Sequence, residues 1–247
     1  MTFAKFVGAV VLLLAVNPAF AADAPLRVLV PAYAQAAVTA LTPVIEAQAG
    51  VAIALEFATT DVIVERLTKG DAGDLVVTSK NSLAPEAMRA RVDGQHDVAV
   101  STVGIAVARD AKPPKLASSQ DLARFLTETP SFGYSTAQSG RHIAGVIEKL
   151  GLTEAMKAKS QTGAGLMGTR IIEGKLASVG QQISELRLAG LTNIVPLPDE
   201  HQLRIVVTAA AVKTGRRAQD AAKVIDVLAS AGAAQAYKDA GLIPLKK

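Results

Sequence analysis

Three short segments carry residues that could together bind an anion. Each follows an apolar, strand-like run and precedes a helical pattern, and they span residues 31–34, 58–61 and 136–140. The first turn of a helix presents unpaired N–H groups and the positive end of the helix dipole, so it attracts an anion without any basic side chain. The candidate contacts in these segments are hydroxyl residues and a glycine: Tyr33, Thr59, Thr60, Ser139 and Gly140.

Two cationic side chains follow the third segment. The guanidinium of Arg141 could hold a carboxylate through two hydrogen bonds, and His142 or Tyr33 could act as a general acid or base. The helix dipole disfavours positive charge at a helix start, which favours a compensating anion beside Arg141 and His142. The alternative is an exposed arginine and a structural histidine, just as Thr59 and Thr60 could simply cap a helix.

Two further positions could contact the same ligand. Gly165 lies in the glycine-rich stretch 162–168, and Gln182 lies at the end of a strand-like stretch. No Lys-Ser/Thr pair follows these glycines as it does in a phosphate-binding P-loop, so a flexible loop is the alternative for Gly165. The amide of Gln182 could contact the ligand, act at a hinge, or be only a polar strand end.

The composition excludes several classes of site. The chain has 247 residues with no cysteine and three histidines, so we expect neither a disulfide nor a metal site. No Gly-x-Gly-x-x-Gly opens a helix after the first strand, and neither Gly-x-Ser-x-Gly nor His-Glu-x-x-His is present, so we predict no cofactor. The net charge of +4 is spread thinly, without a long basic run, so we expect no nucleic-acid partner.

The first residues have the pattern of a secretory leader. Lys5 precedes an apolar run over residues 6–16, and Ala19 and Ala21 form an Ala-x-Ala site. The run is shorter than the roughly 20 residues that span a bilayer, so we predict a signal peptide over residues 1–21, cleaved after Ala21. The pattern therefore predicts an exported chain that works in the periplasm.

Strands and helices alternate along the rest of the chain. We predict strands at residues 26–30, 51–57, 74–78, 98–108, 131–134, 178–183 and 203–212. We predict helices at residues 35–48, 62–69, 118–126, 141–150, 218–229 and 233–240, and a turn at 136–140. This alternation favours parallel strands with right-handed crossovers, which is an α/β fold.

Two long apolar strands, at 98–108 and 203–212, bracket the middle of the chain. A chain that leaves one lobe, builds a second and returns would use such a pair as its hinge. We therefore predict a first lobe of residues 22–104 and 206–247 and a second lobe of residues 105–205. Ligands of open α/β sheets bind beyond the carboxyl ends of strands, which is where the three polar segments lie.

Several motifs resemble one known family. They are Phe57-Ala58-Thr59-Thr60, Gly73-Asp74-Leu75-Val76-Val77, Phe132-Gly133-Tyr134 and Val179-Gly180-Gln181-Gln182-Ile183-Ser184-Glu185. With them, nearly all of the mature chain resembles the periplasmic molybdate-binding components of ABC transporters, in the type II solute-binding superfamily. The resemblance implies two lobes, each a mostly parallel sheet flanked by helices, joined by two hinge strands. It also implies a protein that closes over a small anion and delivers it to an inner-membrane permease. We expect a monomer, because the sequence gives no reason to expect an oligomer.

Carrying over the family's oxyanion contacts gives a changed set. Thr60 takes the place of one serine, and backbone N–H contacts fall on Ser139 and near Gly165, whereas Tyr33 and Ile183 stand where the family has a serine and a tyrosine. Removed donors must be replaced for a tetrahedral oxyanion to bind. The chain is therefore similar to a divergent member, for which an organic carboxylate is expected before molybdate.

A second interpretation stays open, because the periplasmic aconitate isomerases are similar to this same family. Such an enzyme would move an allylic proton to interconvert trans- and cis-aconitate without a cofactor. Arg141 would then clamp the tricarboxylate, and His142 or Tyr33 would move the proton. We expect a binding protein before an enzyme.

Overall fold

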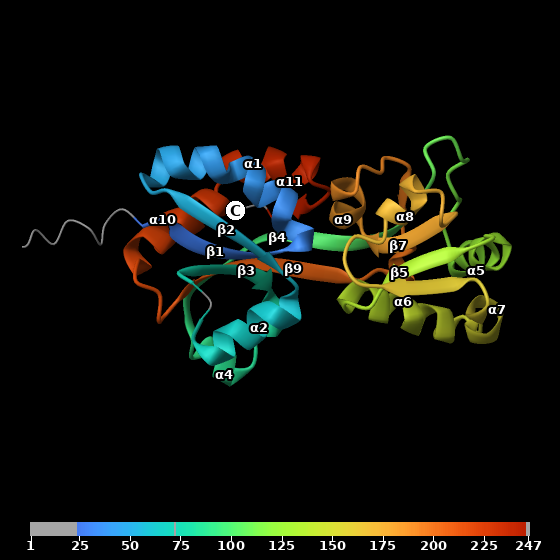
Figure 1. Ribbon diagram of the computed structural model, residues 1–247, viewed down its shortest axis with the longest axis horizontal. Helices are drawn as coiled ribbons and strands as arrows, with labels where there is room; N and C mark the ends of the chain where they lie inside the picture. Colours follow the sequence, from blue (N-terminus) through green and yellow to red (C-terminus); the bar gives the residue numbers. More distant parts are fainter. Residues whose placement is uncertain (1–23, 72, 246–247) are drawn as a thin grey trace, which may run out of the picture.

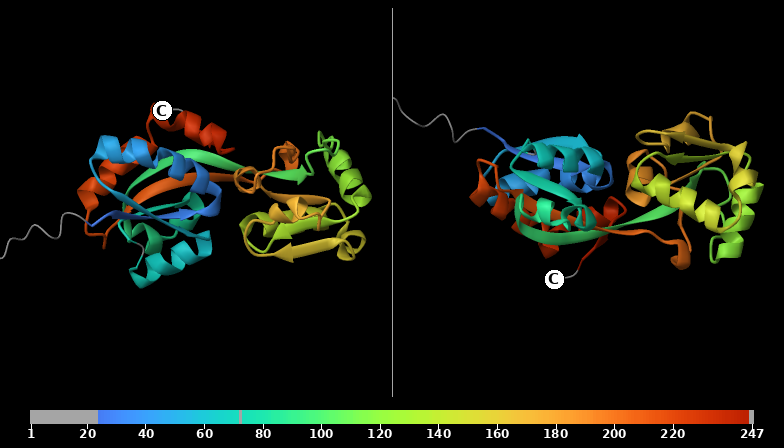
Figure 2. Two further views of the ribbon diagram at one scale, coloured as in Figure 1. Left: turned by 45° about the horizontal axis from the view of Figure 1, so that its top comes forward. Right: turned by 90° about the horizontal axis from the view of Figure 1, so that it is seen from below.

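The computed structural model describes residues 24–71 and 73–245. The predicted signal peptide lies outside the described residues, so its presence and its cleavage after Ala21 stay predictions. Figures 1 and 2 show two bodies, with strand β4 (Val92–Val107) running from the first into the second. Within the described ranges, none of the helices is both long and apolar enough to cross a membrane.

The first body is built on one sheet whose strands lie in the order β2-β1-β3-β9-β4. Strand β1 is parallel to β2 and β3, and β9 is antiparallel to β3 and β4. The parallel pairing predicted for the first three strands is confirmed. Besides β4, this sheet contains β1 (Leu26–Pro31), β2 (Ile53–Ala58), β3 (Leu75–Ser79), β9 (Arg204–Val212) and the short β10 (Ile243–Pro244), which pairs with β4.

Helices cover both faces of this sheet (Figure 1). Successive strand residues point to opposite faces, so Val28 and Val30 pack with one set of helices and Leu29 with another. The first set is α1 (Ala32–Ala49), α10 (Ala218–Leu228) and α11 (Ala234–Asp239). The second set is α2 (Thr60–Lys69), α3 (Lys80–Leu83) and α4 (Glu86–Arg89).

The second body repeats this plan on a smaller scale, with the strand order β4-β7-β5-β6. Strand β5 is parallel to β6 and β7, and the end of β4 is antiparallel to β7. Its strands are β5 (Phe132–Ser135), β6 (Ser160–Gly163), β7 (Ser178–Gln182) and β8 (Ile194–Pro196). Its helices are α5 (Ser119–Glu128), α6 (Gln138–Lys149), α7 (Thr153–Lys157), α8 (Thr169–Ile172) and α9 (Ile183–Leu188).

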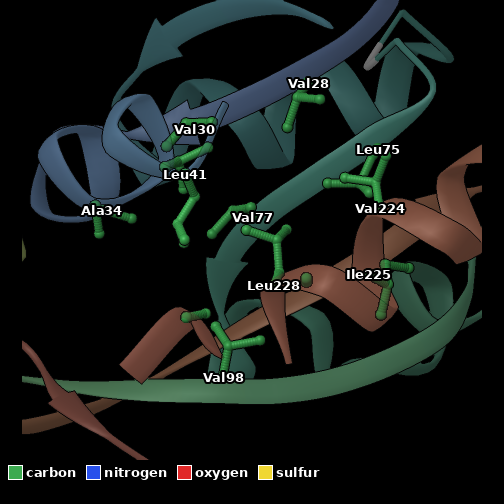
Figure 3. Close-up of a cluster of buried hydrophobic side chains, with 14 of the residues drawn as sticks. Val28, Val30, Ala34, Leu41, Leu75, Val77, Val98, Val224, Ile225 and Leu228 are labelled. Carbon is green, nitrogen blue, oxygen red and sulfur yellow. The ribbon is translucent and has the colours of Figure 1, made fainter. Parts of the chain in front are cut away.

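Each body has apolar cores of its own. Figure 3 shows the largest, where strand residues such as Val28 and Val77 meet Leu41 of α1 and Leu228 of α10. The second body packs Phe132 against residues of α5, α6 and α7. The buried residues of the two bodies therefore form separate clusters rather than one shared core.

Strand β4 belongs to both sheets, since residues 92–102 pair with β9 and residues 103–107 pair with β7. This change of partner lies two residues before the boundary predicted from the sequence. We propose that the lobes divide there, close to the predicted bounds of residues 22–104 and 206–247 for one lobe and 105–205 for the other. The α/β fold predicted for the chain is confirmed.

Several predicted element ends were wrong. The predicted turn at 136–140 is helical from Gln138, because Ala137 has the extended backbone of an N-cap and α6 starts after it. The predicted strand 178–183 ends at Gln182, and the helix α9 that follows was not predicted. Strand β4 begins at Val92 rather than at residue 98, through an exposed polar stretch with two register shifts that hide its alternation.

Candidate functional site

A cavity of about 50 Å3 lies where the starts of three longer helices meet the end of β7. Its volume is several times what one water molecule needs. Helices α1 and α2 reach it from the first body, and α6 and α9 reach it from the second. The lining residues are Pro31, Ala32, Tyr33, Thr59, Thr60, Asp61, Ala137, Gln138, Gln182 and Glu185.

Two of the three longer helices, α1 and α6, have no side-chain cap at their starts. The N-cap residues are Pro31 for α1 and Ala137 for α6, and neither helix has an acidic residue in its first turn. Capping side chains normally satisfy the first N–H groups of a helix and offset its dipole. The uncapped starts of α1 and α6 therefore leave donors and positive potential directed at the cavity.

The third start, that of α2, is capped from within. Thr59 Oγ1 accepts a hydrogen bond from the backbone N–H of Val62 at 3.3 Å, while Thr59 also lines the cavity. Thr59 therefore has the capping role that its position allowed from the sequence, and Thr60, the first residue of α2, lies beside it on the cavity wall.

Tyr33 places a buried hydroxyl at the cavity. Its side chain is 4% exposed, and Oη has no hydrogen-bond partner in the described part of the chain. Burial raises the pKa of Tyr33 well above its usual range; the nearby Thr60 and Thr78 hydroxyls oppose this shift, and Glu185 adds to it. Neither threonine meets Oη in good hydrogen-bond geometry, so the hydroxyl is a buried donor without a partner in the described part of the chain.

Glu185 is a cavity residue that the sequence analysis did not select. It lies in the first turn of α9 and is only 8% exposed. Burial raises its pKa to about 7, although the side chain of Gln181 and the backbone of Gln182 favour the charged form. Glu185 occupies the third helical position, where glutamate commonly serves a capping box, so its spacing alone gave no sign of a site residue.

Four of the nine predicted contacts line the cavity: Tyr33, Thr59, Thr60 and Gln182. Ser139 and Gly140 follow the lining residue Gln138 in the first turn of α6, where both are buried. A Cβ built on Gly140 would lie 1.5 Å from the carbonyl oxygen of Ser135. Glycine therefore lets the α6 start pack directly on the end of β5.

The other three predicted contacts lie outside the cavity lining. Arg141 donates to the backbone oxygen of Thr136 at 3.2 Å, and its Nη2 lies 3.7 Å from the carboxylate of Asp61. His142 Nε2 donates to the backbone oxygen of His201 at 2.7 Å. Gly165 has a φ of +77°, and its oxygen accepts a hydrogen bond from the Gln181 side chain at 2.9 Å.

The Asp61–Arg141 pair joins α2 of the first body to α6 of the second at the edge of the cavity. Both side chains are more than half exposed, so this pair contributes little to stability. The lining residues themselves include no lysine, arginine or histidine. Across residues 24–71 and 73–245, histidine and carboxylate side chains nowhere gather in a group that could hold a metal ion.

The amino-acid sequence matches one family of known proteins. Residues 26–243 match the bacterial extracellular solute-binding proteins. The chain is also 27% identical over 246 residues to the aconitate isomerase of a Pseudomonas species, covering 95% of this chain and 94% of that enzyme.

Solved structures share the fold at low identity. The Azotobacter vinelandii periplasmic molybdate-binding protein has a TM-score of 0.74 at 15% identity, over 90% of this chain and 100% of that one. The Geobacter sulfurreducens tungstate ABC transporter structure has a TM-score of 0.67 at 15% identity, over 88% of this chain and 99% of that one. With the family match over most of its length, the chain belongs to the bacterial extracellular solute-binding protein family and has the type II periplasmic-binding fold.

Proposed function

We propose that this protein is a periplasmic receptor that closes over a small anion and delivers it to an ABC-type permease. The observation that carries the proposal is the pair of uncapped helix starts, α1 and α6, that reach one cavity from opposite bodies. An anion held by both would be bound more tightly when the bodies are close, and such differential affinity is what drives hinge closure.

The donors around the cavity support an oxyanion or a carboxylate. Backbone N–H groups and the hydroxyls of Tyr33 and Thr60 can each donate to negatively charged oxygen. The structural relatives whose names describe molybdate and tungstate support the same chemistry. Arg141 lies beside the cavity rather than in it, so we place it at the rim, where it holds Asp61.

A ligand screen tests the proposal. Isothermal titration with molybdate, tungstate, citrate, trans-aconitate and cis-aconitate is expected to give binding with at least one of these anions. Tyr33→Phe should weaken that binding by about 1.5–3 kcal/mol, because a hydrogen bond to a charged group is lost. Tyr237→Phe is the matched control, since Tyr237 Oη bonds to the Leu228 backbone within the core and should leave affinity unchanged. Absence of binding by every anion in the screen would refute the receptor.

The second candidate is an isomerase of unsaturated tricarboxylates. It is favoured by the whole-length similarity to an aconitate isomerase and by the carboxylate of Glu185 in the cavity. A base with a pKa of about 7 can accept and return a proton at neutral pH. Here it would take a proton from the methylene carbon of trans-aconitate and the C–H electron pair would become the new double bond. The electron pair of the original C=C bond would then accept a proton, returned by Glu185, at the carbon farther from that methylene.

The isomerase is tested separately. Purified protein incubated with trans-aconitate should produce cis-aconitate, and Glu185→Gln should abolish the conversion while anion binding persists. Binding of trans-aconitate without any cis product would remove this candidate and leave the receptor intact.

A further inference from the structure

Glu185 is a carboxylate at an anion cavity without a cation to balance it. Arg187, two residues further along α9, donates to the backbone oxygens of Lys238 and Asp239 at the end of α11. Arg141 of α6 lies against Asp61. The residues that line the cavity include no basic side chain that could pair with Glu185. The two arginines nearby in the fold, Arg187 and Arg141, have other partners.

The other groups that face Glu185 do not replace a cation. Tyr33 comes from α1 and stays a neutral phenol, Asp61 from α2 is paired with Arg141, and Gln138 from α6 and Gln182 from β7 are neutral amides. Helix α9 packs against α1, β4, β7 and β8. Helix α1, strands β7 and β8, and residues 103–107 of β4 contain no lysine, arginine or histidine. The positive potential comes from helix starts alone.

An ionised Glu185 and a bound anion would repel each other inside a cavity of about 50 Å3. Like charges at such close range disfavour ionisation of one partner, so a proton is retained at the pair. A protonated Glu185 carries no charge and gains an O–H donor, which can point at the ligand. One proton thus converts a repulsive group into a further contact.

We infer that the cavity takes up its anion together with one proton, which resides on Glu185 in the complex and donates a hydrogen bond to the ligand. This inference rests on the proposed anion-binding function. It makes Glu185 a specificity-determining residue that weakens retention of an anion wherever the proton is lost.

The experiment measures proton uptake directly on the full mature chain. Titrations with molybdate, citrate and trans-aconitate are run in two buffers of different ionisation enthalpy between about pH 7.5 and 9, where Glu185 is largely ionised before binding. Wild type is expected to take up about one proton for each anion bound, and its affinity should fall roughly tenfold for each pH unit over this range.

Two variants assign the proton. Glu185→Gln keeps a neutral donor of the same shape, so it should bind without proton uptake and with affinity independent of pH. Glu148→Gln removes an exposed carboxylate of α6 that does not line the cavity and is the matched control, expected to retain proton uptake. Binding of a probe by wild type without proton uptake, or uptake that persists in Glu185→Gln, would overturn the inference while the receptor stands. If no probe binds at any pH, the proposed function fails, and the inference fails with it.

Discussion

Burial of Glu185 should make the free protein less stable as pH rises. Its pKa moves from an ordinary value of 4.5 to about 7 in the folded chain, with burial as the main cause. The folded state therefore binds more protons than the unfolded state between these values, and the linkage relation makes stability fall as pH increases. The loss develops between about pH 4.5 and 7, is complete above that range, and amounts to about 3 kcal/mol.

Glu185→Gln isolates this effect because glutamine is neutral at every pH and still suits the third position of a helix. The unfolding free energy is measured by urea titration at about pH 5 and about pH 8. In wild type it should be lower at the higher pH, and this decrease should be about 3 kcal/mol smaller in the variant. In a thermal scan the difference corresponds to roughly 6–12 °C for a chain of this size. Other carboxylates contribute equally to both proteins.

Carboxylates with lowered pKa values act in a different window. Arg27 and Arg66 lower the pKa of Glu56, so its contribution is present above the ordinary value and is lost as pH falls further. This loss of stability occurs as pH falls, so it cannot be mistaken for the loss expected from Glu185 as pH rises. Parallel stability curves for wild type and Glu185→Gln between about pH 5 and 8 would refute the burial argument.

Two substitutions, Gly140→Ala and Tyr33→Phe, test the helix starts beside the cavity, and each has a matched control variant. Gly140→Ala should cost roughly 3 kcal/mol or more, because its Cβ meets the backbone oxygen of Ser135, whereas Gly145→Ala on the same helix has open space and should be neutral or slightly stabilising. Tyr33→Phe should raise the stability of the free protein by about 1 kcal/mol, since it removes a buried hydroxyl without a partner. Tyr237→Phe should lower it by a similar amount, through loss of its bond to Leu228. Urea unfolding of the four variants gives all these values, and a stable Gly140→Ala would show that α6 can start elsewhere.

The fold was readable from the sequence because its signals are local. Apolar runs such as Leu26–Pro31 and the glycine after α1, Gly50 with a φ of +67°, specify where elements begin and end. The polar start of β4 was missed because its bulges interrupt the alternation of side chains. Helix α9 was missed because it follows β7 without a turn residue between them.

The site was only partly readable, because its contacts depend on orientation. Tyr33, Thr59, Thr60 and Gln182 line the cavity, and their contact with a ligand stays a prediction. His142 was selected because a histidine follows Arg141 near the start of α6. Its ring instead donates a hydrogen bond to the backbone oxygen of His201. Glu185, in contrast, lines the cavity but was not selected from the sequence. Only its burial distinguishes it from an ordinary glutamate at a helix start.

The charges around the cavity explain why a proton should govern this site. Asp61 and Arg141 face each other across the two bodies and offset one another, which leaves helix starts as the source of positive potential. The N-terminal end of a helix carries about half a positive charge, so the uncapped starts of α1 and α6 together balance about one negative charge. An ionised Glu185 would use that potential itself, and a protonated Glu185 leaves it for the ligand. The proton on Glu185 therefore decides whether the cavity is already neutralised or still able to hold an anion.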